Sequence, residues 1–143
     1  QPIFTPATKA EDGEHDENIT YKQCEEIIGS QAATILKKLT LALYSRAHEY
    51  AESKGIILAD TKFEFGIDPS GAICLGDEAL TPDSSRFWEP ETHYSYDKQF
   101  VRDWLLNSGW DRNSNPPPLP SEIVSKTRER YVQAYELLTG RKF

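Results

Sequence analysis

The charged residues between Ala59 and Trp88 are the part of the chain best equipped for chemistry. Alternate side chains of an extended strand point to the same face, which predicts that Asp60, Lys62 and Glu64 stand in one row. Carboxylates held close together repel one another unless a cation or a proton lies between them. The segment therefore indicates a ligand site, and its charged residues are Asp60, Lys62, Glu64, Asp77, Glu78, Asp83 and Arg86.

A tight hairpin is expected to bring these charges together. The Asp-Pro-Ser-Gly turn at residues 68–71 would return the chain as a strand over 72–75, which places Asp77 and Glu78 near the row. The alternative is the solvated face of an edge strand. The apolar run at residues 56–59 favours the site, because such a run is typical of a buried strand.

Two kinds of ligand suit this set of charges. Mg²⁺ takes oxygen ligands, commonly one or two carboxylates together with substrate phosphates, and Glu64 with Asp77 would be enough. Arg86 follows the hydroxyls of Ser84 and Ser85, and its guanidinium offers a planar fork for a phosphate or a carboxylate. Taken alone, Arg86 could equally be a surface arginine.

The hydrophobic spacing predicts three helices that flank this segment. A capping-box pattern opens the first helix, over residues 20–54, and its apolar residues recur at gaps of three and four. Two further helices are expected over 97–107 and 121–139. The fold class is therefore α/β (α+β in stricter usage), with a small, mainly antiparallel sheet packed on the long helix. The expected helix-terminal residues are Thr20, Gly55, Asp97, Ser121 and Gly140.

Composition narrows the classes of function. The net charge of −7 over 143 residues argues against a general nucleic-acid binder, which needs a basic surface. No apolar run approaches the roughly 20 residues that span a bilayer, so no membrane segment is expected. Cys24 and Cys74 lack any paired metal spacing and are expected to be buried free thiols, which favours a cytoplasmic location.

Four stretches of the chain resemble the SAICAR synthetase family (phosphoribosylaminoimidazole-succinocarboxamide synthases) of purine biosynthesis. They follow one another in the order expected for the family, which makes the match specific, and the tail over 116–140 resembles the end of family members. The resemblance implies that residues 1–143 are the C-terminal, larger lobe of a two-lobed ATP-dependent ligase. The stretches are FTPATKAEDGEHDENIT, ADTKFEFG, LGDEALTPDSSRFW and DKQFVRDWL.

The resemblance also implies an activity and roles for individual residues. The family joins L-aspartate to the carboxylate of carboxyaminoimidazole ribonucleotide, using ATP and Mg²⁺, through an acyl phosphate. Glu64 and Asp77 would hold Mg²⁺ against the ATP phosphates, and Lys9 would contribute to the cofactor site. Asp60, Lys62 and Arg86 would be the catalytic residues. The residues implied to contact substrate are Asp60, Lys62, Asp83, Ser84, Arg86, His15 and Asp16.

The N-terminal lobe of the family, with its glycine-containing segment over the nucleotide phosphates, has no counterpart in these 143 residues. The chain alone is therefore expected to show no measurable turnover. The alternative is a non-catalytic module that binds a cation or nucleotide and regulates a partner. The intact charged motif positions argue against that alternative, and the reading frame upstream of Gln1 would discriminate between the two.

Overall fold

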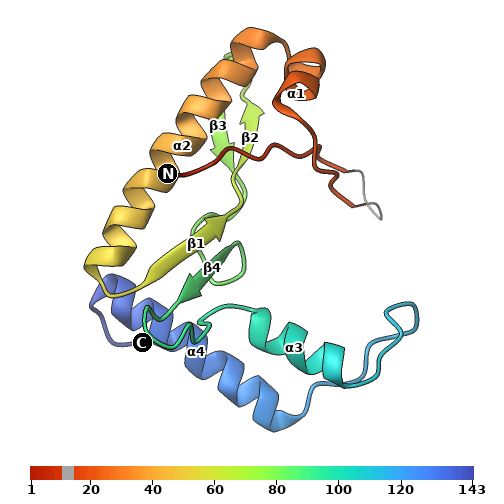
Figure 1. Ribbon diagram of the computed structural model, residues 1–143, viewed down its shortest axis with the longest axis vertical. Helices are drawn as coiled ribbons and strands as arrows, with labels where there is room; N and C mark the ends of the chain where they lie inside the picture. The colour runs from red at the N-terminus through yellow and green to blue at the C-terminus, as the bar shows by residue number, and fades with distance from the viewer. Residues whose placement is uncertain (11–14) are drawn as a thin grey trace. The chain divides into compact units, whose positions relative to one another are not determined.

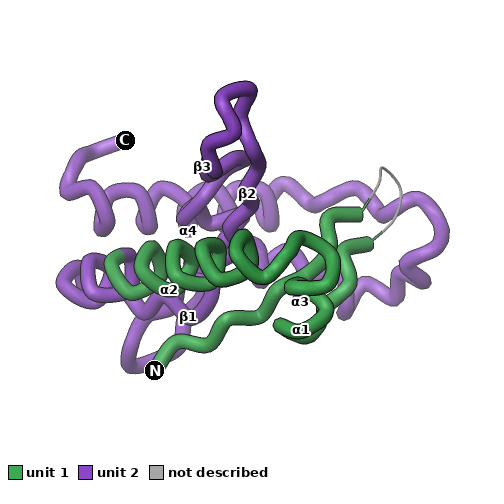
Figure 2. The backbone as a smooth tube through the Cα atoms, turned by 90° about the horizontal axis from the view of Figure 1, so that it is seen from above, with its two compact units in different colours: residues 1–46 green, residues 47–143 purple. Residues whose placement is uncertain are grey.

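The computed structural model describes residues 1–10 and 15–143, with helices and strands joined by loops (Figure 1). These residues divide into two compact units, residues 1–46 and residues 47–143 (Figure 2), and the charged segment over 59–88 lies wholly in the second unit. The elements are α1 (Tyr21–Ile28), α2 (Ser30–Ser53), β1 (Ile57–Thr61), β2 (Glu64–Ile67), β3 (Ile73–Gly76), β4 (Ser85–Trp88), α3 (Gln99–Asn107) and α4 (Ser121–Thr139).

The prediction of one long helix over 20–54 is wrong in one respect, because the chain forms two helices there. Gly29 separates α1 from α2 with φ 84° and ψ 147°, a conformation that is almost restricted to glycine. The capping box that opens α1 is confirmed: the Thr20 hydroxyl accepts the Gln23 amide N–H, and Gln23 Oε1 accepts the Thr20 N–H at 2.8 Å. Gly55, with φ 74°, follows the end of α2 as expected.

The four strands form two antiparallel ribbons rather than one sheet. β2 and β3 form the predicted hairpin, and Asp68 stabilises its turn because its Oδ1 accepts the N–H groups of Ser70 and Ala72, each at 2.9 Å. The antiparallel pairing and the mixture of helices with strands confirm the predicted fold class.

β1 pairs with β4, a partner that lies outside the hairpin (Figure 1). The register places Asp60 opposite Arg86, after a shift between Leu58 and Asp60. Asp60, Lys62 and Glu64 do not lie on one continuous strand as predicted, because β1 ends at Thr61 and β2 begins at Glu64. Lys62 and Phe63 lie between the two strands, and the Lys62 N–H donates to the Ser84 carbonyl oxygen at 3.1 Å.

Buried apolar side chains from several elements form the core of the unit over 47–143. Ala51 near the end of α2, Ile56 and Leu58 at β1, and Phe87 on β4 are all at most 2% exposed. Ala134 on α4 is fully buried, and α3 packs against that helix. Apolar side chains of β1 and β4 therefore pack into the core and hold the two strands in place. Polar side chains of the same strands line a cleft.

Of the residues expected at the ends of α3 and α4, Gly140 is confirmed in its place. The N-cap residue of α3 is Lys98, which makes no side-chain cap, so the prediction for Asp97 is wrong by one position. The Asp97 carboxylate still accepts the Gln99 N–H at 2.8 Å from the residue before the N-cap. Gly140 ends α4 in the left-handed conformation, with φ 68° and ψ 13°. The prediction for Ser121 is wrong: Ser121 is the first helical residue, and Pro120 occupies the extended N-cap position without a side-chain cap.

Both cysteines are free thiols, as predicted. Cys24 is buried on α1, whereas Cys74 on β3 is exposed, so the expected burial of both is wrong for Cys74. In β3 only Ile73 is partly buried and the next three residues are exposed, so the apolar run there did not ensure burial. Across residues 1–10 and 15–143, each helix is too short or too polar to cross a membrane.

Candidate functional site

A charged cleft of about 530 Å³ lies in the unit over 47–143. Its walls come from β1, the start of β2, the loop after β3, β4 and the first part of α3. Every site residue that the sequence predicted in this unit lines the cleft, although the strands pair differently from the prediction. These residues are Asp60, Lys62, Glu64, Asp77, Asp83, Ser84 and Arg86.

The Asp60–Arg86 pair lies at the β1–β4 ribbon. The register shift before Asp60 places the two residues opposite each other, and a β-bulge of this kind can re-aim a side chain towards a site. Arg86 Nε donates to both Asp60 carboxylate oxygens, at 2.9 and 3.0 Å, and Arg86 Nη2 contacts Oδ2 as well. This hydrogen bonding raises the pKa of the Arg86 guanidinium. The pair therefore holds a permanent cation in a fixed orientation at the cleft wall.

Glu64 and Asp77 lie at the same end of the β2–β3 ribbon. Glu64 is paired in register with Gly76, and Asp77 is the next residue along the chain. Asp77 has φ 57°, a left-handed conformation that Asp tolerates better than most residues, so the chain bends directly after β3. Glu64 is 21% exposed, and its Oε1 lies 2.7 Å from Lys62 Nζ.

This donor set fits Mg²⁺. Carboxylates at the start of β2 and directly after β3 provide hard oxygen ligands, and Mg²⁺ typically uses one or two carboxylates and completes its shell with phosphates and water. Within residues 1–10 and 15–143, no group of three or more His, Cys, Asp or Glu side chains could hold a metal.

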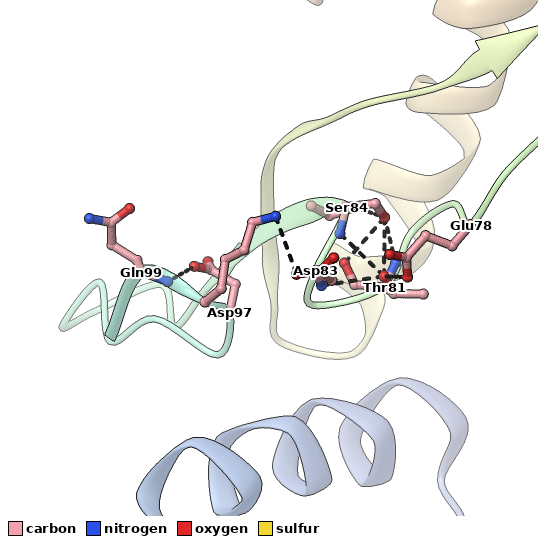
Figure 3. Close-up of polar contacts among 8 residues, drawn as sticks. Glu78, Thr81, Asp83, Ser84, Asp97 and Gln99 are labelled. Carbon is pink, nitrogen blue, oxygen red and sulfur yellow. Dashed lines mark hydrogen bonds and ion pairs between the residues drawn. The ribbon is translucent and has the colours of Figure 1, made fainter. Parts of the chain in front are cut away.

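The loop before β4 is fixed by its own hydroxyl groups (Figure 3). Thr81 Oγ1 donates to Glu78 Oε2 at 2.6 Å and accepts the Ser84 N–H at 3.2 Å. Ser84 Oγ in turn accepts the Thr81 N–H at 3.0 Å. The Ser84 hydroxyl thus has a structural partner in the loop, which sets the position of Asp83 at the cleft.

Several lining residues were missed as site residues, and three of them lie at or near the start of α3. Asp97 is 1% exposed and accepts the Phe87 N–H at 3.1 Å, so it ties α3 to β4. Lys98 Nζ lies 3.2 Å from Asp83 Oδ1, and its hydrogen bond lowers the pKa of the Asp83 carboxyl. Arg102 lies four residues further along the helix. The spacing of Lys98 and Arg102 on one helix face was the available signal.

Lys9, His15 and Asp16 belong to the unit over 1–46. Asp16 Oδ1 accepts the Ala10 N–H at 2.9 Å, so this carboxylate stabilises the loop that carries it. Lys9 and His15 are exposed. Residues 11–14 of the same motif lie outside the described residues, and the roles of these three side chains in substrate binding stay predictions.

Comparison with known proteins places the chain in one family. The family model described as SAICAR synthetase matches residues 1–117. The chain is 57% identical to the phosphoribosylaminoimidazole-succinocarboxamide synthase of Streptomyces coelicolor, covering 99% of this chain and 50% of the relative. It is 53% identical to the enzyme of that name from Pasteurella multocida, covering 97% of this chain and 51% of the relative.

Solved structures agree with the sequence comparison. The SAICAR-synthase of Saccharomyces cerevisiae, solved in complex with SAICAR, matches with a TM-score of 0.84 and 47% identity, over all of this chain and 48% of that one. A SAICAR synthetase in complex with ADP matches with a TM-score of 0.75 and 31% identity, over all of this chain and 53% of that one. The chain thus spans about half the length of the curated relatives it matches, and it belongs to the SAICAR synthetase family.

Proposed function

We propose that this chain forms the C-terminal lobe of an ATP- and Mg²⁺-dependent ligase of purine biosynthesis. The reaction joins L-aspartate to the carboxylate of carboxyaminoimidazole ribonucleotide and gives SAICAR. The observation that carries the proposal is the cleft, because it collects the charged residues of three separate motifs in one cavity. Two solved relatives, described as complexed with SAICAR and with ADP, support the product and the nucleotide.

The chemistry proceeds through an acyl phosphate. A carboxylate oxygen of the ribonucleotide attacks the γ-phosphorus of ATP, and ADP leaves. The amine of aspartate then attacks the acyl carbon, and inorganic phosphate leaves with the bonding pair while the amine loses a proton. Phosphoryl transfer of this kind depends on positioning and charge neutralisation rather than on a covalent bond to the protein.

Glu64 and Asp77 hold Mg²⁺ in this proposal. The metal, when bound, neutralises charge on the phosphate oxygens during transfer. Glu64 is suited to this role because it is mostly buried and its neighbour Lys62 fixes one of its oxygens. The loop after β3 aligns Asp77 with Glu64, since Glu64 and Gly76 are partners in the ribbon.

The remaining motif residues bind the ribonucleotide. Arg86 faces its phosphate, and Asp60 keeps the guanidinium in orientation through the paired hydrogen bonds. Lys62 supplies a second positive charge at the point where phosphate transfer occurs. Asp83 and Ser84 shape the side of the pocket next to β4.

Lys9, His15 and Asp16 border the substrate in the assembled enzyme. The partners are small molecules together with the rest of the enzyme, with no nucleic acid or membrane, and the enzyme works in the cytoplasm. The relatives extend over about twice the length of this chain, and we assign the other half of the ATP site to that additional length. These 143 residues alone are accordingly expected to show no turnover.

The test is Asp77→Asn in the full-length protein, followed by Mg²⁺-dependent release of ADP. We expect the variant to lose turnover, because an amide is a weaker ligand for a hard cation than a carboxylate. Asp103→Asn is the matched control, since Asp103 lies on α3 outside the cleft lining. Near-normal activity of Asp77→Asn would remove the metal assignment. A full-length protein that binds Mg²⁺ but releases no ADP with these substrates would favour the non-catalytic module.

A further inference from the structure

We propose that two copies of this protein associate through an apolar groove along α4, with their α4 helices packed antiparallel about a two-fold axis. The groove has a volume of about 490 Å³ and is lined by residues of α4 together with Val101, Leu119 and Phe143. It belongs to the unit over 47–143, and its lining shares no residue with the charged cleft. The inference therefore goes beyond the proposed function.

The surface of the groove is almost wholly apolar, although much of it faces water. Val124 is 51% exposed, Tyr135 38% and Phe143 77%. The rings of Tyr135 and Phe143 meet edge to face with their centroids 5.8 Å apart, so they form one continuous wall. Thr127 acts as an apolar residue here, because its hydroxyl donates to the Ile123 carbonyl oxygen at 2.7 Å. A contiguous exposed apolar surface of this kind is typical of a protein–protein contact.

The side chains that α4 contributes to the groove match a reversed copy of the same helix. In a two-fold contact, residue i of one copy meets residue j of the other, and residue j meets residue i. Reversing α4 about the midpoint between Glu129 and Arg130 has this property, because it exchanges the groove residues among themselves. The exchanged pairs are Val124 with Tyr135, Thr127 with Val132, and Arg128 with Tyr131.

These pairs join side chains of compatible chemistry. Val124 would pack on the ring of Tyr135 from the second copy, and two such contacts would form across the axis. Among the described residues that line the groove, Arg128 is the one that carries a charge. Its guanidinium already lies 5.4 Å from the centre of the Phe143 ring, and a cation beside an aromatic ring is favourable. In the antiparallel register Arg128 meets Tyr131 of the second copy instead of a second Arg128.

The size of the groove fits a small interface. α4 has 19 residues and is therefore about 28 Å long. A stable interface buries about 800 Å² on each partner, and smaller ones belong to transient complexes. A contact built on one helix with Val101, Leu119 and Phe143 beside it lies at the lower end. We therefore expect monomer and dimer to exchange at about micromolar concentrations.

The extent of the family match favours a second copy over the remaining length of the enzyme. The family model matches residues 1–117, and α4 begins at Ser121. A surface that receives the other half of every family member is expected within the matched segment. The main wall of the groove lies beyond that segment, so we assign the groove to a contact between copies.

Sedimentation velocity of the full-length protein, from about 0.1 to 100 μM, brackets this association. We expect wild type to shift from monomer to dimer. Tyr135→Glu and, separately, Val124→Glu should raise the dissociation constant at least about 30-fold, because a two-fold contact places each new carboxylate in the apolar groove twice. Leu137→Glu is the matched control: Leu137 lies on α4 and is 42% exposed, but it does not line the groove. This control should dimerise like wild type.

Cross-linking tests the antiparallel register. The double variant Val124→Cys with Tyr135→Cys, made in a Cys74→Ser background, should be linked between copies by a short bismaleimide, because the two positions lie at the same level. Val124→Cys without Tyr135→Cys should stay unlinked, since equivalent residues of antiparallel helices would lie about 16 Å apart along the axis.

Three results would overturn the inference. Wild type could stay monomeric over the whole range, or the dissociation constant could be the same in wild type and in both groove variants. Cross-linking of Val124→Cys alone, with none in the double variant beyond that level, would contradict the register. A monomeric wild type whose groove variants lose their far-ultraviolet circular dichroism would assign the groove to the remaining length of the enzyme. The ADP-release assay is independent of each of these outcomes.

Discussion

Replacing Asp97 by alanine is predicted to loosen the join between β4 and α3. Asp97 is 1% exposed and its two carboxylate oxygens accept the Phe87 N–H at 3.1 Å and the Gln99 N–H at 2.8 Å. Alanine can accept neither bond. Phe87 is itself only 2% exposed, so its N–H would be left buried without a partner.

The size of the effect follows from those two bonds. A buried polar group left unsatisfied costs about 1–3 kcal/mol. The Phe87 N–H should lie at the upper end of that range because its residue is buried, and the Gln99 N–H at the lower end because a helix start can be hydrated. The predicted loss in the free energy of unfolding is therefore about 2–4 kcal/mol, a large part of the about 5–15 kcal/mol typical of a folded protein. Asp97→Asn keeps one acceptor oxygen and should lose about half as much.

Amide hydrogen exchange in the full-length protein measures the loss of the two hydrogen bonds directly at the Phe87 and Gln99 amides. Protection of the Phe87 and Gln99 amides should fall in Asp97→Ala, while amides of the β2–β3 ribbon keep theirs. Urea unfolding gives the overall loss, and Asp103→Asn on the exposed side of α3 is the control. Equal protection at Phe87 in wild type and Asp97→Ala, or a loss no larger than that of the control, would refute the reasoning.

Two other predictions concern titration and reactivity. The Lys98 hydrogen bond lowers the pKa of Asp83, so its stabilisation is complete above the unfolded value of about 3.9 and is lost as the pH falls through the lower folded value. Lys98→Gln should raise that pKa in a ¹³C carboxyl titration, and an unmoved titration would contradict the pairing. Cys74 is exposed and should be alkylated first. Cys24 should react more slowly, because it is 7% exposed and burial raises the pKa of its thiol. Mass-spectrometric mapping measures the rate of alkylation at each cysteine, and equal rates at Cys24 and Cys74 would refute this order.

Local chemistry made much of the site predictable. The turn at residues 68–71 is set by its own Asp and Gly, and it brings Glu64 beside the segment that carries Asp77. The capping box at the start of α1 is equally local. In these places a few neighbouring residues determine the structure, so the sequence pattern was sufficient.

Long-range pairing was not predictable in the same way. β1 pairs with β4 between residues that are 24 or more positions apart in the chain, and nothing in either strand alone specifies that partner. Gly29 interrupts a continuous apolar spacing, and a glycine in a helical pattern is also compatible with an unbroken helix. In the sequence, Asp97 has the pattern of an ordinary helix cap. Its hydrogen bond with the Phe87 N–H depends on how α3 packs against β4 and was not predictable.

The central claim is that Glu64 and Asp77 share one divalent cation in the cleft. Crystals of the full-length protein grown with Mn²⁺ and ADP test it directly, since anomalous scattering locates Mn²⁺ independently of the surrounding atoms. We predict one anomalous peak with a carboxylate oxygen from each residue in its coordination shell, at about the 2.0–2.1 Å typical of Mg²⁺ or slightly longer. A bound cation with both carboxylates outside its shell would contradict the account.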